Sequence, residues 1–251
     1  MLDRHIHTGR FNETYYTPLQ IIEIVMGKCK DGLCFSSTTS CKEGILYSEV
    51  EKEIGDTLAN IPWSSEIVRP FLWYSPHFAK QGVTAEKAMQ NLPYKGIKIH
   101  PLANRWDLTD TKTMSIAHGL FEYAGQYKLP VLIHTGENGV DAPTVFSRFF
   151  PLYPETIFIL AHCRPAEETI PLLQNYPNVY GDTAFLSVEN MQKIKSKNLV
   201  HKILPGTDFP ITHYFANRYP QGASEITLAE QYKRDFALMK KYKTIGDRLP
   251  V

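Results

Sequence analysis

The chain opens with Met1-Leu2-Asp3-Arg4-His5-Ile6-His7, where two histidines stand two residues apart just after a short apolar start. Alternate side chains of a β-strand share one face, so His5 and His7 would point one way and Ile6 the other. Two imidazoles on one face of a strand end are suited to bind a metal ion. Because such pairs also occur by chance at solvated strand ends, the rest of the chain must decide the meaning of this one.

Short apolar runs, typical of buried strands, alternate with longer amphipathic stretches along the whole chain. The predicted strands are Leu2–His7, Gly32–Ser37, Ile67–Trp73, Gly96–His100, Val131–His134, Ile157–Ala161, Asn178–Gly181 and Lys202–Pro205. The predicted helices lie near 18–30, 43–60, 84–92, 111–127, 142–150, 165–175, 187–197 and 227–242. Eight strands alternating with eight helices in 251 residues have the size and rhythm of a (β/α)₈ barrel.

An open, doubly wound α/β sheet is the competing architecture. The first predicted strand is not followed by the glycine-rich turn of a dinucleotide fold. Polar residues suited to metal binding also close strands from the first to the last, and only a closed ring brings those strand ends together. We therefore predict that residues 1–251 form a single α/β domain, a TIM-type (β/α)₈ barrel with its active site at the C-terminal strand ends.

Histidine, lysine and aspartate side chains stand at the ends of five predicted strands. They are His5 and His7 after the first strand, Lys98 and His100 after the fourth, His134 after the fifth, His162 after the sixth and Asp208 after the eighth. Neutral imidazoles with one carboxylate form a typical ligand set for zinc or a similar divalent ion. The pattern therefore predicts a metal site at the rim of the barrel.

Composition excludes several other classes of protein. With 27 Lys+Arg against 26 Asp+Glu, the net charge of +1 gives no support for a nucleic-acid partner or an anionic membrane surface. The sequence shows no apolar run near the roughly 20 residues of a membrane span and no basic-then-apolar signal segment. Four cysteines without a CxxC pair favour free thiols in a reducing cytoplasm. We expect a cytoplasmic protein with a small-molecule substrate, and a homodimer is a further expectation.

The chain resembles the amidohydrolase superfamily, specifically the amidohydrolase-related branch that includes decarboxylases. The matching segments follow the family order: HIHTG (5–9), GIKIHP (96–101), PVLIHTGENG (130–139), ILAHCRP (159–165), NVYGDTA (178–184) and ILPGTDFP (203–210). The resemblance implies a distorted (β/α)₈ barrel. Many members add a small β-sandwich built partly from residues before the HxH strand. Because only four residues precede His5, we expect no such domain.

The resemblance also implies a ligand set and a reaction. His5, His7, His134 and Asp208 would hold one divalent ion, with zinc as the expected metal, and His162 would contact the bound water or the substrate. The implied enzyme is a hydrolase whose metal-activated water attacks the carbonyl of an amide, ester or lactone. Asp208 would accept the proton of the water and deliver it to the leaving group.

Three residues near these ligands are predicted to bind substrate: Lys98, His100 and Arg164. Cys163-Arg164-Pro165 stands where this branch usually has glycines after the sixth-strand histidine, which places a guanidinium at the mouth of the site. By strand alternation Lys98 points into the barrel with His100. In dihydroorotase-like relatives a lysine here is carbamylated and bridges two metals. A free amine and a structural ion pair are the alternatives, and we favour the amine.

Three rival functions stay open. The branch includes metal-dependent decarboxylases, so carbon–carbon cleavage of a small carboxylate is the first. A TatD-like deoxyribonuclease is the second, although that group has a glutamate near the position of Lys98 and nucleic-acid binding favours more positive charge. The third is a metal-binding or sensor protein without catalysis.

Overall fold

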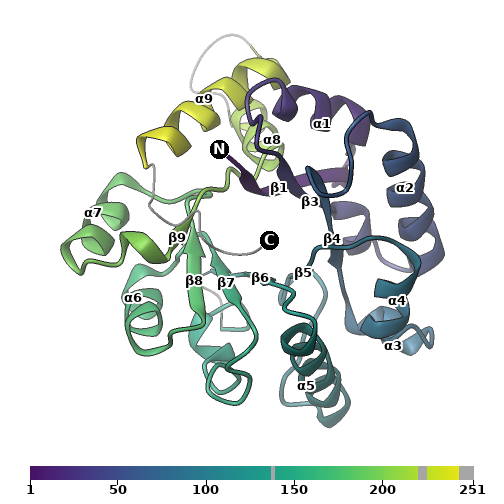
Figure 1. The fold of residues 1–251 in the computed structure, drawn as a ribbon, viewed down its shortest axis with the longest axis vertical. Helices are drawn as coiled ribbons and strands as arrows, with labels where there is room; N and C mark the ends of the chain where they lie inside the picture. Colours follow the sequence, from purple (N-terminus) through teal and green to yellow (C-terminus); the bar gives the residue numbers. More distant parts are fainter. Residues whose placement is uncertain (137–138, 220–224, 243–251) are drawn as a thin grey trace.

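The strands form a ring with the helices outside it (Figure 1). The structure is a computed structural model, and it describes residues 1–136, 139–219 and 225–242. Parallel neighbours follow one another in the order β1 (Asp3–Phe11), β3 (Leu33–Ser37), β4 (Val68–Trp73), β5 (Gly96–Ile99), β6 (Val131–His134), β7 (Phe158–Ala161), β8 (Val179–Asp182) and β9 (Ile203–Leu204). All eight predicted strands are confirmed.

The first strand meets the segment that follows the last one, and this contact closes the ring. The backbone N–H of Arg4 donates to the carbonyl of Pro205 at 2.9 Å, and the N–H of Asp208 donates to the carbonyl of His5 at 2.8 Å. Gly206 permits this approach, because a Cβ there would lie 2.8 Å from the Cβ of His5. The predicted barrel is confirmed, and the strands of the described residues all belong to one sheet.

Nine α-helices occur in the described part of the chain. They are α1 (Pro18–Met26), α2 (Tyr47–Asn60), α3 (Pro76–Lys80), α4 (Ala85–Asn91), α5 (Thr111–Gln126), α6 (Ala166–Asn175), α7 (Val188–Ser196), α8 (Ile211–Arg218) and α9 (Leu228–Lys241). The side chains of Thr84 and Asp110 cap α4 and α5, and Thr227 forms a capping box with Glu230 at the start of α9. None of these helices is long and apolar enough to cross a membrane.

Several elements differ from the sequence-based expectation. The helix predicted at 142–150 is only a short 3₁₀ helix, η2 (Pro143–Phe146), followed by turns. The helix-like spacing of this segment comes from Phe146, Phe149 and Phe150. All three side chains are fully buried, although the backbone that carries them is a 3₁₀ helix followed by turns. The hairpin strand β2 (Thr14–Tyr16), antiparallel to β1, and the helices α3 and α8 were not predicted.

Alternation along the strands separates two apolar layers and aims the polar strand ends inward. On β6, Val131 and Ile133 join the large core cluster under the helices, whereas Leu132 belongs to a smaller cluster with Phe71 and Leu204 from other strands. Since every second side chain shares a face, His134 points to the same side as Leu132. The ring interior is therefore apolar below and polar at the C-terminal rim.

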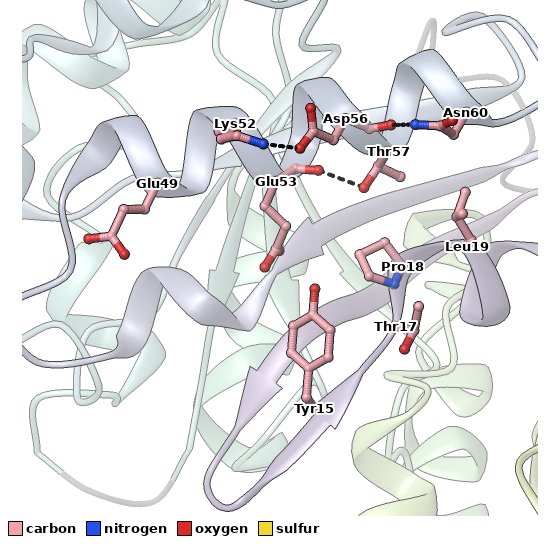
Figure 2. A pocket seen from close by; sticks show the side chains of 10 residues that line it. All are labelled: Tyr15, Thr17, Pro18, Leu19, Glu49, Lys52, Glu53, Asp56, Thr57 and Asn60. Atoms are coloured by element: carbon pink, nitrogen blue, oxygen red, sulfur yellow. Dashed lines mark hydrogen bonds and ion pairs between the residues drawn. The ribbon is translucent and has the colours of Figure 1, made fainter.

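A separate hollow lies outside the ring, between the β1–β2 hairpin and α2 (Figure 2). Its acidic side chains are already engaged within the protein. Glu53 accepts hydrogen bonds from the hydroxyls of Ser37 and Thr39, and Asp56 pairs with Lys52 one helical turn away. This hollow is thus part of the packing of α2 against the hairpin.

Candidate metal centre

Three ligand atoms from the two ends of the chain converge at the rim of the barrel. The Nε2 atoms of His5 and His7 lie 3.1 Å apart. Oδ1 of Asp208 lies 2.9 Å from Nε2 of His7 and 3.3 Å from Nε2 of His5. All three side chains are buried, with exposed fractions of 1%, 4% and 6% for His5, His7 and Asp208. The closure of the ring produces this arrangement, because it seats the loop after β9 against β1.

The outer nitrogens of both imidazoles are held by other residues. Nδ1 of His5 lies 2.7 Å from Oδ2 of Asp182, and Nδ1 of His7 lies 3.0 Å from the hydroxyl of Ser36. A carboxylate on one ring nitrogen fixes the tautomer and leaves the other nitrogen with its lone pair, whereas a hydroxyl can donate or accept. Nε2 of His5 is therefore an acceptor, whereas Nε2 of His7 can donate to Oδ1 of Asp208 while no ion is bound.

The protonation of this set suits a divalent cation. Burial, together with the nearby Lys98 ammonium, holds the pKa of His5 well below its ordinary value, so the ring is neutral. Burial works against ionisation of Asp208, but His5 and the hydrogen bond from His7 bring the pKa of its carboxyl to about 2. Neutral imidazole and ionised carboxylate are the forms that bind zinc and related ions, so the donor set fits.

Asp182 is a site residue that the sequence analysis missed. Its carboxylate is buried and accepts from the backbone N–H of His162 at 2.8 Å as well as from His5. It thereby joins β8 to β1 and β7. The signal was present in the segment NVYGDTA, since Asp182 ends a strand just as the predicted ligands do.

His134 and His162 form a second pair of imidazoles. Nδ1 of His134 lies 3.1 Å from Nε2 of His162, and the His162 ring stacks on His5 with centroids 5.3 Å apart. Nδ1 of His162 lies 3.2 Å from the carbonyl of Ala184, which can only accept. His162 must therefore carry its proton on Nδ1, and its Nε2 accepts from His134. His134 therefore contacts His162, and His162 in turn lies against His5, one of the three residues whose ligand atoms converge.

His134 has two further neighbours on its other side. Its ring stacks on His100 with centroids 3.7 Å apart. His100, His134 and the buried Asp141 offer ligand atoms within 4.8 Å of one another. The carboxylate of Asp141 accepts from the N–H of Leu102 at 2.9 Å and so ties the loop after β5 to the loop after β6. Asp141 was not among the predicted site residues.

The cationic residues predicted to bind substrate also face this cluster. The fully buried Lys98 places Nζ 3.3 Å from Nε2 of His5, and burial lowers the pKa of its amine. Arg164 is partly buried, and its Nε donates to the carbonyl of Thr135 beside β6 at 3.3 Å. Burial lowers the pKa of His134 and of His162, and the positive charges of Lys98 and Arg164 lower both further. The inward orientation predicted for Lys98 is observed.

A family model described as amidohydrolase matches residues 61–237. The chain belongs to the amidohydrolase family. The matched range includes every predicted site residue from Lys98 to Asp208 and begins after the HxH pair. Amidohydrolases are generally metal-dependent enzymes, in agreement with the histidine and aspartate clusters at this rim. No curated protein matches the chain.

A solved structure shares the barrel of this amidohydrolase at low sequence identity. An uncharacterized TIM-barrel protein from Bordetella bronchiseptica is 14% identical, with 95% of this chain and 99% of that chain covered and a TM-score of 0.56. It supports the fold alone. An N-acetylneuraminate lyase from Mycoplasma synoviae is also 14% identical, with 96% of this chain and 97% of that chain covered and a TM-score of only 0.40.

Proposed function

We propose that the protein is a metal-dependent hydrolase that attacks the carbonyl carbon of a small amide, ester or lactone. The observation that carries the proposal is the convergence of His5 Nε2, His7 Nε2 and Asp208 Oδ1 within 3.3 Å, in a chain of the amidohydrolase family. A divalent ion held by these atoms, with zinc the first expectation, would supply a nucleophilic water by lowering its pKa from 15.7 to about 7.

Asp208 and the residues around the three converging ligands have distinct roles in this proposal. Asp208 is ionised near neutral pH, so its carboxylate is available to accept the proton of the attacking water and to return it to the leaving group. His162 is proposed to orient that water or the substrate through Nε2, in exchange for the hydrogen bond that Nε2 accepts from His134. Lys98, His100 and Arg164 are proposed to bind substrate, since their side chains lie beside the same histidines.

The number of metal ions depends on the chemical form of Lys98. As an amine, Lys98 contacts His5 directly and one ion is expected, with His134 as its fourth protein ligand. As a carbamate, it would supply oxygen ligands for a second ion that His134 and His162 would help to hold, so two ions would be expected. We propose the amine. If an intact-mass measurement shows a carbon dioxide adduct on Lys98, the amine form is wrong and the two-ion form applies.

Decarboxylation of a small carboxylate is a second candidate, favoured by one observation. Lys98 and Arg164 bring two positive charges to His134 and His162, a setting suited to hold a carboxylate. Release of carbon dioxide from a substrate, without uptake of water into the product, distinguishes this reaction from hydrolysis.

Elemental analysis combined with a substrate screen tests the proposal. The purified protein should contain about one equivalent of a divalent metal, and it should turn over at least one member of a panel of amides, esters and lactones. His7→Ala should lose both metal and turnover, whereas the matched change His201→Ala, at an exposed position before β9, should keep both. A wild-type protein that binds no divalent metal, or a His7→Ala variant with unchanged turnover, would contradict the proposal.

A further inference from the structure

A cavity of about 410 Å³ opens between two loops at the C-terminal ends of β5 and β6. Part of its lining comes from residues 101–109 after β5, and part from residues 139–148 after β6. Its volume falls in the range of about 300–1,000 Å³ that is usual for small-molecule sites. The lining described for it includes none of the residues assigned to the candidate metal centre. It is therefore a second concave site on the same rim.

The walls of this cavity are largely apolar. Trp106 and Leu108 are buried and form part of its lining, together with Val145. Leu102 and Val140 also line it but stay 49% and 46% exposed. Covering such side chains with an apolar ligand removes their surface from water, which favours binding. The lining thus favours a ligand with an apolar chain or ring.

The described lining of the cavity carries two cationic side chains, Arg105 and Arg148, against one carboxylate, Asp107. Arg148 donates through Nη2 to the carbonyl of Leu108 at 3.3 Å, which leaves further N–H donors of its guanidinium. Arg105 lies 4.0 Å from Glu43, but both side chains are so exposed that this pair is weak. Oδ1 of Asp107, the acidic group of the lining, accepts from the N–H and the hydroxyl of Thr109 at 2.9 and 2.6 Å. An anionic group therefore complements this cavity.

The cavity is also preformed. The N–H of Trp106 donates to the carbonyl of Pro101 at 2.9 Å, and Asp141 accepts from the N–H of Leu102, so hydrogen bonds hold the loop after β5 in place and tie it to Asp141. The buried indole Nε1 of Trp106 has no hydrogen-bond partner among the residues that the structure describes. A buried donor without a partner is costly, and a ligand oxygen that reached it would remove that cost.

We propose that this cavity is a second small-molecule site that binds an amphipathic anion. The apolar part of the ligand lies against Trp106, Leu108 and Val145, and its carboxylate pairs with the guanidinium of Arg148 at the edge. The proposal stands apart from the hydrolase function, because it uses none of the residues assigned to the metal centre.

Calorimetric titration of the full chain with octanoate and with octanol tests this site. Octanoate should bind with one molecule per chain, and octanol should bind about fivefold more weakly, because it lacks the charge that pairs with an exposed guanidinium. Arg148→Gln should abolish this preference, whereas Arg234→Gln, the same change at an exposed position on α9, should preserve it. Equal affinity for the two probes in the wild-type chain, or an unchanged preference in Arg148→Gln, would overturn the proposal.

Two more variants locate the bound probe. Val145→Phe should fill the cavity and weaken both octanoate and octanol, with thermal unfolding used to confirm that the variant is folded. His7→Ala should bind octanoate as the wild type does, even in the presence of a chelator. Loss of octanoate binding in His7→Ala would place the probe at the metal centre and overturn the second site. Failure of the hydrolase proposal leaves this result unaffected.

Discussion

Oδ2 of Asp182 lies 2.7 Å from Nδ1 of His5, although 177 residues separate them in the sequence. This contact crosses the seam where the first and last strands of the ring meet. It sets the tautomer of His5, so that Nε2 faces His7 and Asp208 with a free lone pair. The carboxylate at the end of β8 therefore prepares a metal ligand on β1.

Replacing that carboxylate should weaken metal binding without removing a direct ligand. In Asp182→Asn the amide can donate toward Nδ1 of His5 and favour the wrong tautomer, so affinity for zinc should fall about 10–100-fold. Competition with a chromophoric chelator measures this affinity. Asp56→Asn, on the exposed face of α2, is the matched control and should bind zinc as the wild type does. Equal affinity in Asp182→Asn would show that Asp182 does not orient His5.

Asp208 should be needed for turnover beyond its part in metal binding. Asp208→Asn removes the proposed proton acceptor, and general acid–base groups usually contribute about 10²–10⁴-fold to the rate. We expect a loss of at least that size in kcat for whichever substrate the screen finds. The assay is run at a metal concentration that saturates the variant, with occupancy verified by elemental analysis. Near wild-type turnover in the metal-loaded variant would refute this role.

The barrel could be predicted because strand alternation is a local property of the sequence. Val131, Leu132 and Ile133 show which side chains of β6 face the helices and which face the ring interior, and His134 follows in the same phase. The same rule placed Lys98 inside the ring, where the structure has it. Length and the regular recurrence of such strands then favoured a closed ring.

The contacts among the strand ends could not be predicted in the same way. The pairing of Asp182 with His5 depends on the register between β8, β9 and β1, which is set by contacts far apart in the sequence. The neighbours of His134 depend on the rotation of its ring and on Asp141, which belongs to a loop. The apolar spacing around Phe146 led to the wrong prediction of an α-helix. An irregular backbone that buries each of its aromatic rings can show the same spacing as a helix.

The close approach of Gly206 to His5 predicts a steric test of the seam. In Gly206→Ala the new Cβ would lie 2.8 Å from the Cβ of His5, so the loop that carries Asp208 must move away from β1. We expect weaker zinc binding and a lower thermal midpoint. Gly119→Ala is the matched control. Gly119 lies at an exposed position in the middle of α5, and a Cβ there would meet no atom within 4 Å. That change should leave zinc binding intact and raise stability by about 0.5–1 kcal/mol. If both variants bind zinc equally, the seam is not tightly packed.

The buried carboxyl of Asp3 should make the stability of the metal-free protein depend on pH. Burial raises its pKa from 3.8 to about 7, against the opposing hydrogen bonds from Thr207, His5 and Tyr232. The folded protein therefore retains a proton that the unfolded chain releases above pH 3.8. The stability from this group is full at lower pH and is lost as pH rises from about 4 to 7.

Asp3→Asn removes this titration while it keeps a polar side chain among the same partners. The variant should gain stability relative to the wild type as pH rises through that window, by up to about 4 kcal/mol, with no further change above pH 7.5. Urea unfolding of both proteins in chelator, at intervals from pH 4 to 8, measures the difference and cancels the other titrating groups. A difference that stays constant across this range would mean that Asp3 is ionised throughout, and that its hydrogen bonds outweigh its desolvation.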